Sequence, residues 1–173
     1  MRRCAAALAA SLPLLAHGAW ISSEHLVHAA RSDAHGAEHF GAQLVLTPDE
    51  SHFLKAWRVS NTPQQLPATA TVRRGASVIA MLVFQGCARD ATGRCDVVAD
   101  LVLQAPDGGR IRGGSTSLWS AESVPGHLHL GNGSMQVSFD PHDRIGRYKV
   151  IATVRDRVSG QSLVLSSGLQ VLE

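Results

Sequence analysis

Two apolar segments with different patterns lie near the middle of the chain. Val78 to Phe84 is apolar at every position, which is typical of a strand covered on both faces. From Val97 to Leu103 the residues alternate so that one face of a strand would be more buried than the other. Cys87 and Cys95 bound the polar loop between the two segments. The pattern predicts two core strands joined as a hairpin by a disulfide-closed loop.

The C-terminal third shows the clearest alternation. Apolar residues recur at every second position from Tyr148 to Val154 and at most second positions from Leu163 to Val171, which predicts two strands. Ser159-Gly160 marks a turn between them, and Met135 to Phe139 predicts a shorter strand before them. Strands at intervals of roughly 8–12 residues with turn signals between them predict an all-β fold, an antiparallel β-sandwich.

The pattern is weaker elsewhere in the chain. Phe40 to Leu46 predicts a first strand and Thr69 to Val72 an edge strand. Between Arg110 and Gly133 only two short strands are indicated, near Ser117–Trp119 and His127–Leu130. This part of the sandwich therefore stays largely unassigned.

A short helix is predicted after the first strand. Thr47 is placed as its cap, Pro48 as its first residue, and Glu50 reaches back to the cap. Apolar residues between Phe53 and Trp57 recur at spacings of three and four, so they would share one side of the helix.

Residues 1–19 are predicted to be a secretory signal peptide. Arg2 and Arg3 precede an apolar run that is too short to span a membrane, and small residues follow it. Cleavage near Gly18 or Ala19 would leave a periplasmic or secreted protein without a transmembrane anchor.

The rest of the chain divides into two parts. Residues 20–39 are polar and histidine-rich, and we expect them to be flexible. Residues 40–173 are long enough for one domain with its own core. Without the two leader arginines, 14 of the 16 basic residues remain against 14 acidic ones. A neutral chain is not expected to bind nucleic acid, because that requires a net basic face.

Cys87 and Cys95 are the cysteines that remain after the leader is removed. An even pair in an oxidising compartment favours a disulfide. Metal binding is the alternative, but the spacing matches no common zinc motif. Closing so short a loop would stabilise the fold by roughly 2.5 kcal/mol. Because the chain has no Cys-x-x-Cys, we expect the bond to be structural.

The motif Asp143-x-x-Gly146-x-Tyr148-x-Val150 precedes and enters the penultimate predicted strand. It resembles the corner of immunoglobulin-like domains in which a tyrosine hydroxyl bonds to upstream backbone. Val150 stands where antibody domains carry their second cysteine. Residues 40–172 also resemble small exported bacterial β-sandwich proteins of uncharacterised function, with Gly-Cys-x7-Cys-Asp and Pro-Asp-Gly elements. The resemblance implies an immunoglobulin-like fold with Asp143, Gly146 and Tyr148 as a structural corner, and it implies no active site.

Histidines in the N-terminal segment are candidate ligands for copper or zinc. They form two pairs, three and four residues apart, and the residues are His25, His28, His35 and His39. The alternative is a solvated tail that happens to be rich in histidine. His127 and His129 are a weaker candidate pair, since residues two apart face the same side of a strand.

No pattern for catalysis stands out. The chain has no Gly-x-Ser-x-Gly elbow, and Asp140 and Asp143 are more simply interpreted as turn residues. We therefore expect a non-catalytic protein that needs no cofactor.

The function that the sequence favours is an exported binding or accessory domain that recognises another protein in the cell envelope. The cysteine-closed loop would project Arg89, Asp90 and Arg94 toward that partner. The alternative is a periplasmic accessory protein that binds copper or zinc through the N-terminal histidines.

Overall fold

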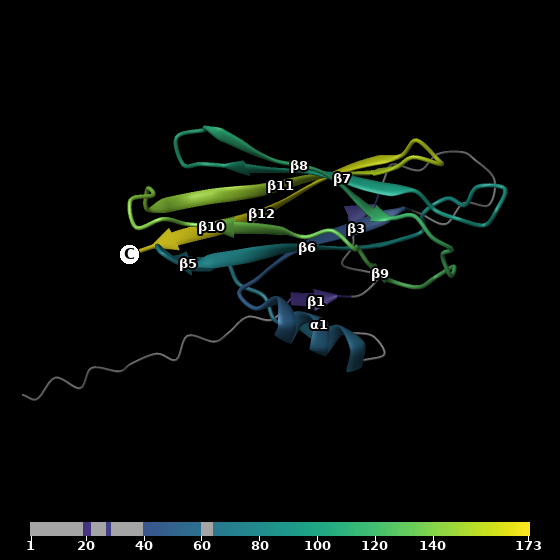
Figure 1. Ribbon diagram of the computed structural model, residues 1–173, viewed down its shortest axis with the longest axis horizontal. Coiled ribbons are helices and arrows are strands. Elements are labelled where there is room, and N and C mark those ends of the chain that lie inside the picture. Colours follow the sequence, from purple (N-terminus) through teal and green to yellow (C-terminus); the bar gives the residue numbers. More distant parts are fainter. Residues whose placement is uncertain (1–18, 22–26, 29–39, 60–63) are drawn as a thin grey trace, which may run out of the picture.

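The computed structural model describes residues 19–21, 27–28, 40–59 and 64–173 (Figure 1). Strands make up most of this part of the chain, which also contains one α-helix. In chain order the elements are β1 (Ala19–Ile21), β2 (Val27–His28), β3 (Gly41–Thr47), α1 (Glu50–Val59), β4 (Gln64–Leu66), β5 (Thr71–Arg73), β6 (Ser77–Gln85), β7 (Val97–Gln104), β8 (Arg110–Trp119), β9 (His129–Leu130), β10 (Met135–Ser138), β11 (Gly146–Asp156) and β12 (Ser162–Leu172).

The strands form two stacked sheets and a small two-stranded pair, β1 with β4. One sheet has the order β10-β6-β3-β2 with β9 beside β6, and we call it the covered sheet. The other has the order β5-β12-β11-β7-β8, and we call it the open sheet. The order β12-β11-β7-β8 corresponds to strands G, F, C and C′ of a variable-type immunoglobulin domain, and β3-β6-β10 corresponds to A, B and E. The chain is an all-β, immunoglobulin-like sandwich with one short helix, as the sequence predicts.

Strand β6 is buried on both of its faces, which explains its unbroken apolar run. Alternate side chains from Val78 to Phe84 face the core between the sheets. Those between them, including Met81 and Val83, join a second apolar cluster with Phe53 of α1. Helix α1 covers the outward face of this sheet (Figure 1).

Strands β7, β11 and β12 face the core with every second residue. The inward-facing residues of β7 and β11 are Val97, Ala99, Leu101, Leu103, Tyr148, Val150, Ala152 and Val154. Most residues between them are exposed or half-buried. This confirms the predicted alternation, which reflects a sheet covered on one side only.

The loop between Cys87 and Cys95 does not form a hairpin, so this prediction was wrong. Strand β6 pairs with β3, β9 and β10, whereas β7 pairs with β8 and β11. The loop therefore crosses from one sheet to the other. Two apolar segments show that both strands reach the core, but their pairing depends on contacts with strands far away in the sequence.

The start of α1 also differs from the prediction. The helix begins at Glu50, and Asp49 caps it, because its Oδ1 accepts a hydrogen bond from the His52 N–H at 2.9 Å. Thr47 is instead the last residue of β3 and pairs with Ile79. Its place in the sheet prevents it from acting as the cap.

Two short strands lie in or overlap the segment 20–39, whose flexibility stays a prediction. Trp20 and Ile21 belong to β1, which pairs with β4, and His28 belongs to β2, which pairs with β3. Without β2, β3 would be an edge of its sheet, and the unpaired backbone groups of such an edge favour the addition of β2. The rest of the segment and the predicted cleavage residue Gly18 lie outside the described residues, and Ala19 is the first residue of β1.

Strand β8 is much longer than the short strand predicted at its end. It runs from Arg110 to Trp119 and pairs with β7 along most of its length. Gly113 and Gly114 lower its strand propensity. As the edge of the open sheet it exposes most of its side chains, so it lacks the apolar alternation that identifies the other strands.

Candidate functional site

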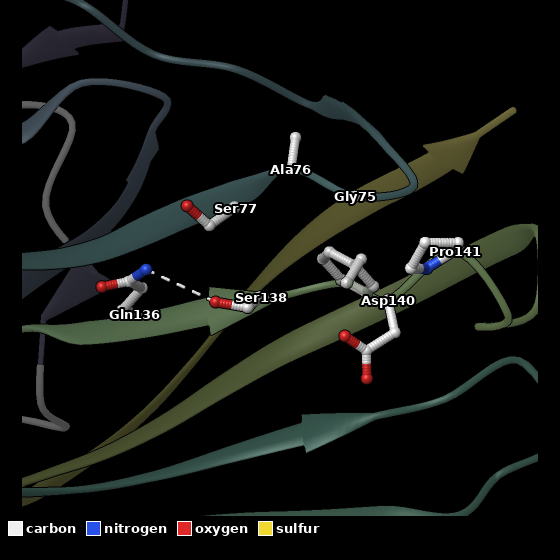
Figure 2. Close-up of a pocket in the computed structure, with 8 residues that line it drawn as sticks. Gly75, Ala76, Ser77, Gln136, Ser138, Asp140 and Pro141 are labelled. Carbon is white, nitrogen blue, oxygen red and sulfur yellow. Dashed lines mark hydrogen bonds between the residues drawn. The ribbon is translucent and has the colours of Figure 1, made fainter.

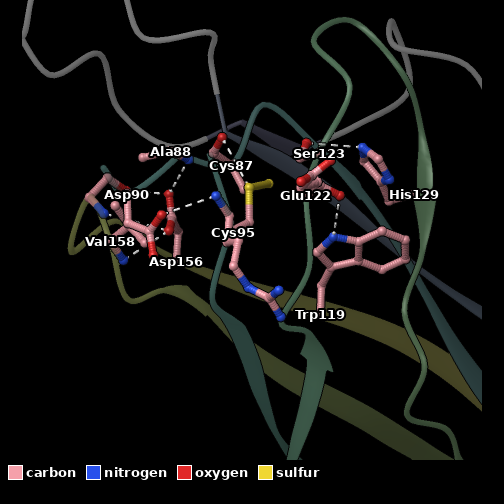
Figure 3. The surroundings of a disulfide bond; sticks show 12 residues. Cys87, Ala88, Asp90, Cys95, Trp119, Glu122, Ser123, His129, Asp156 and Val158 are labelled. Atoms are coloured by element: carbon pink, nitrogen blue, oxygen red, sulfur yellow. Dashed lines mark hydrogen bonds between the residues drawn. A yellow bond between two sulfur atoms is a disulfide. The ribbon is translucent and has the colours of Figure 1, made fainter. Parts of the chain in front are cut away.

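Three connections between strands meet at one end of the sandwich. They are residues 86–96 between β6 and β7, residues 120–128 between β8 and β9, and residues 157–161 between β11 and β12. We call them together the loop end (Figure 3). In variable-type immunoglobulin domains the B–C and F–G loops lie at the binding end, and residues 86–96 and 157–161 occupy those places.

The cysteine-closed loop is attached to both of its neighbours. Cys87 and Cys95 form a disulfide with a Cα–Cα distance of 6.0 Å, and both side chains are buried. The Cys95 N–H donates to the Ala121 carbonyl at 2.9 Å, and the Arg157 N–H donates to the Asp96 carbonyl at 2.8 Å. The three connections are thus linked at their bases.

Asp156 adds a buried polar link between two of these connections. Its side chain is among the few buried charged groups, with 1% of its surface exposed. Oδ2 accepts hydrogen bonds from the Ala88 N–H at 2.8 Å and the Ser159 hydroxyl at 2.6 Å, and Oδ1 accepts one from the Val158 N–H at 3.1 Å (Figure 3). Asp156 was not predicted from the sequence as a site residue. The feature of the sequence that could have indicated it is an aspartate three residues before a serine at a predicted turn.

The three residues predicted to project from the closed loop have different roles. Asp90 Oδ1 accepts hydrogen bonds from the Thr92 hydroxyl at 2.7 Å, the Thr92 N–H at 2.8 Å and the Arg94 N–H at 3.1 Å. These bonds, the one from the Thr92 hydroxyl above all, hold the pKa of Asp90 below its usual value. Arg94 donates from its guanidinium to the Ser120 carbonyl. Asp90 and Arg94 therefore shape the loop, while Arg89 is exposed at its surface.

A cluster of three rings lies beside the disulfide. The ring centroid of His129 is 5.4 Å from that of Phe84 and 4.7 Å from that of Trp119. The Trp119 indole N–H donates to the Glu122 carbonyl at 3.2 Å, and Ser123 Oγ lies 3.1 Å from His129 Nε2. Burial lowers the pKa of His129 and so favours the uncharged form of its ring. The cluster holds residues 120–128 against the end of the sandwich.

The exposed surface of the loop end mixes apolar and charged side chains. Val124 is 54% exposed and Val158 is 39% exposed. Arg157 and Asp96 form an ion pair with an N–O distance of 3.7 Å, and Arg89 lies nearby in sequence on the closed loop. Neither sign of charge dominates this surface.

The structure assembles no metal site within the part of the chain that it describes. No group of three or more His, Cys, Asp or Glu side chains there is placed to hold an ion. His25, His35 and His39 lie outside that part, and only the backbone of His28 is described, in β2. Copper or zinc binding by these four histidines stays a prediction.

His127 and His129 do not form the predicted pair on one strand face. Strand β9 begins at His129, so His127 lies in the preceding turn and is exposed. His129 is instead packed between Phe84 and Trp119.

The corner predicted from the immunoglobulin resemblance lies at the opposite end of the sandwich. The Tyr148 hydroxyl donates to the Arg144 carbonyl at 3.0 Å, and Asp143 Oδ2 accepts from the Asp140 N–H at 2.7 Å. Gly146 has a φ of 145°, which favours glycine over residues with a side chain. Burial raises the pKa of Tyr148, and the charge of Asp143 adds to this effect. The corner is a structural element.

A shallow pocket of about 470 Å³ lies at this same end, between β6 and β10 (Figure 2). Its lining residues are Gly75, Ala76, Ser77, Gln136, Ser138, Phe139, Asp140 and Pro141. Asp140 is the one titratable group among them, and no set of donors converges on the space. The pocket therefore lacks the polar arrangement that a specific small ligand requires.

Comparisons with known proteins assign no family. No protein-family model matches the chain, and no curated protein matches it. A superoxide reductase (neelaredoxin) from Ignicoccus hospitalis matches with a TM-score of 0.44 and 7% identity, over 61% of this chain and 76% of that one. An immunoglobulin-like protein from Pseudomonas aeruginosa matches with a TM-score of 0.34 and 14% identity, over 75% and 92%.

An alkylpurine DNA glycosylase from Pseudomonas fluorescens also matches, with a TM-score of 0.43 and 15% identity over 80% of this chain. The chain spans only 31% of that glycosylase. At these values none of the three structures assigns an activity to the chain. The class of protein is therefore defined by the strand order and the tyrosine corner, which are those of an immunoglobulin-like sandwich.

The described helix is too short and too polar to cross a membrane.

Proposed function

We propose that the chain is an exported, non-catalytic binding domain that recognises another protein through the loop end. The observation that carries this proposal is the linkage of the three connections by the disulfide, by Asp156 and by the bonds of Cys95 and Arg157. Loops that are ordered before binding lose less conformational entropy on association. The loop end has the construction expected of such a surface.

The side chains at this surface support a protein partner. Val124 and Val158 offer exposed apolar area, and the half-buried Trp119 is bonded to the 120–128 connection through the Glu122 carbonyl. Arg89 and the Arg157–Asp96 pair supply charges of both signs around them. Protein interfaces commonly combine an apolar centre with a polar rim in this way.

We further propose that the domain is not an enzyme. Asp90 and Asp156 use their carboxylate oxygens to accept bonds from neighbouring N–H and O–H groups. Ser123 and His129 are in hydrogen-bonding contact, but burial disfavours the imidazolium that would form if His129 took the serine proton. In a catalytic triad a carboxylate orients the histidine ring. The His129 ring interacts instead with the backbone carbonyl of Val124.

The disulfide supports the exported location. Such bonds persist in oxidising compartments, and Cys87–Cys95 closes the connection that crosses between the two sheets. Together with the leader-like residues 1–19, it favours a periplasmic or secreted protein.

Site-specific photo-crosslinking in living cells tests the protein-binding proposal. A photoreactive amino acid is placed at Thr92, Val124 or Val158 of the loop end, with Lys55 of α1 as the exposed control position. We expect discrete protein adducts from the loop-end positions and none from Lys55. Equal adducts from all positions, or none from the loop end, would contradict the proposal. Labelling of Ser123 by a fluorophosphonate would contradict the non-catalytic assignment.

A further inference from the structure

The outward face of the open sheet carries a set of basic side chains that lies apart from the loop end. The strand register places six of them on this face, and they are Arg73, Arg110, Arg112, Arg147, Lys149 and Arg155. All six are exposed. Asp100 is the acidic residue on this face within the described chain, and it is paired with the Arg155 guanidinium. The face therefore carries net positive charge.

Four of these cations gather toward one end of the face. Arg110 of β8 and Lys149 of β11 share one row across the sheet, because both pair with Gln104 of β7. With neighbouring strands about 4.8 Å apart, their backbones are roughly 10 Å from each other. Arg112 and Arg147 occupy the rows on either side of this one.

The positive charge of this cluster is not neutralised by the acids around it. Arg110, Arg147 and Lys149 form no ion pair with any residue that the structure describes. Two acids at the rim of the sheet are paired with arginines outside the cluster. Asp107 pairs with Arg144 at 2.9 Å and Glu173 pairs with Arg74 at 2.8 Å.

The face is a plain sheet surface without aromatic side chains among its described residues. Its uncharged positions hold small polar residues and aliphatic ones such as Val164, which is 68% exposed. Single-stranded nucleic acids are usually bound on stacking aromatic platforms, and tight protein interfaces are usually centred on Trp or Tyr. The chemistry of the face favours an extended plane of negative charge over either of these partners.

We propose that this face binds the surface of an anionic lipid bilayer. Phosphate-bearing headgroups form such a plane, and cations spread across several strands can contact many of them at once. Arg110, Arg112, Arg147 and Lys149 supply the attraction, and Val164 adds exposed apolar area on the same face. Because the loop end lies at the ends of the strands and not on this face, binding through the face leaves it free for a protein partner.

Co-sedimentation with vesicles tests this proposal on the full chain. The vesicles contain either phosphatidylcholine alone or equal parts of phosphatidylcholine and phosphatidylglycerol. The test variant carries Arg110→Gln, Arg147→Gln and Lys149→Gln. The control variant removes the same charge elsewhere through Lys55→Gln, Arg58→Gln and Arg89→Gln, all at exposed positions.

We expect binding to the anionic vesicles only, and a loss of that binding as salt screens the charges. At about fivefold per basic residue, the test variant should bind on the order of 100-fold more weakly, whereas the control variant keeps most of its affinity. Equal losses in both variants, no binding by the unaltered chain, or equal binding to phosphatidylcholine alone would each overturn the proposal. Tighter, face-dependent binding to duplex DNA or to heparin than to the vesicles would overturn the choice of lipid.

Discussion

The two sheets of the sandwich share one core but differ on their outward faces. In the covered sheet, Met81 and Val83 of β6 are buried against Phe53 of α1. In the open sheet, the corresponding outward positions of β11 and β12 hold residues such as Lys149 and Val164, which are exposed. One sheet is thus a middle layer and the other is a boundary with the solvent.

Because of this difference, we expect one sheet to contribute more to stability and the other to be available for binding. Each apolar side chain buried on the second face of β6 adds to stability, so substitutions on that face of the covered sheet should be destabilising. The outward face of the open sheet contributes less to stability, and its side chains are available for binding. Its exposed basic residues are available for the interaction proposed above.

The largest expected effect comes from placing a charge on each outward face. Val83→Asp would bury an unpaired carboxylate where 0% of the valine is exposed, and we expect a loss of at least about 4 kcal/mol of unfolding free energy. Val164→Asp, at a position that is 68% exposed, should cost about 1 kcal/mol or less. Urea unfolding measures both values. Similar losses from the two variants would show that the sheets do not differ as described.

The next effect compares a buried carboxylate with an exposed one. Asp156→Ala removes the acceptor for the Ala88 and Val158 N–H groups, and we expect a loss of about 3 kcal/mol. Asp100→Ala removes the surface pair with Arg155 and should cost about 0.5 kcal/mol. Thermal and urea unfolding of the two variants provide the measurement. A cost for Asp156→Ala as small as that for Asp100→Ala would mean that the carboxylate does not hold the loop end together.

Removal of the disulfide that closes the connection between the sheets should have a slightly smaller effect. The double variant Cys87→Ala/Cys95→Ala is expected to lose roughly 2.5 kcal/mol, because its unfolded chain is no longer restricted by the closed loop. Hydrogen exchange should then increase most at the loop end, while the tyrosine corner at the other end keeps its protection. Uniform loss of protection would contradict a local role for the disulfide.

The smallest effect concerns the pH dependence of the open sheet. Hydrogen bonds from Ser115 and Arg155 hold the pKa of Asp100 below its usual value. A depressed folded-state pKa contributes stability that is present above the unfolded value of about 3.9 and is lost as the pH falls through the folded value. Asp100→Asn should therefore flatten the loss of stability below about pH 4 by a few tenths of a kcal/mol. Urea unfolding at neutral and acidic pH measures this change. If the unfolding free energy of Asp100→Asn falls with pH as steeply as that of the unaltered chain, the prediction is contradicted.

Much of the fold was predictable because the pattern of apolar residues along a strand reflects which of its faces are buried. The unbroken apolar run from Val78 to Phe84 indicates a strand that is buried on both faces. The alternation from Tyr148 to Val154 indicates a strand that is buried on one face. Strand β8 could not be recognised in this way, because an exposed edge strand with Gly113 and Gly114 shows neither an apolar run nor an apolar alternation. The site was only partly predictable, for a different reason. The closed loop was visible from its cysteines, but Asp156 is distant in sequence from the Ala88 N–H that it binds.

The sequence by itself determined which strands reach the core, where a disulfide can close and where the tyrosine corner lies, because local composition controls each of these. Only the tertiary structure decided that β6 and β7 belong to different sheets and that α1 covers one of them. It also decided that cations from β8 and β11 share one face. Strand pairing joins residues far apart in the chain, and no local pattern specifies which strands will become neighbours.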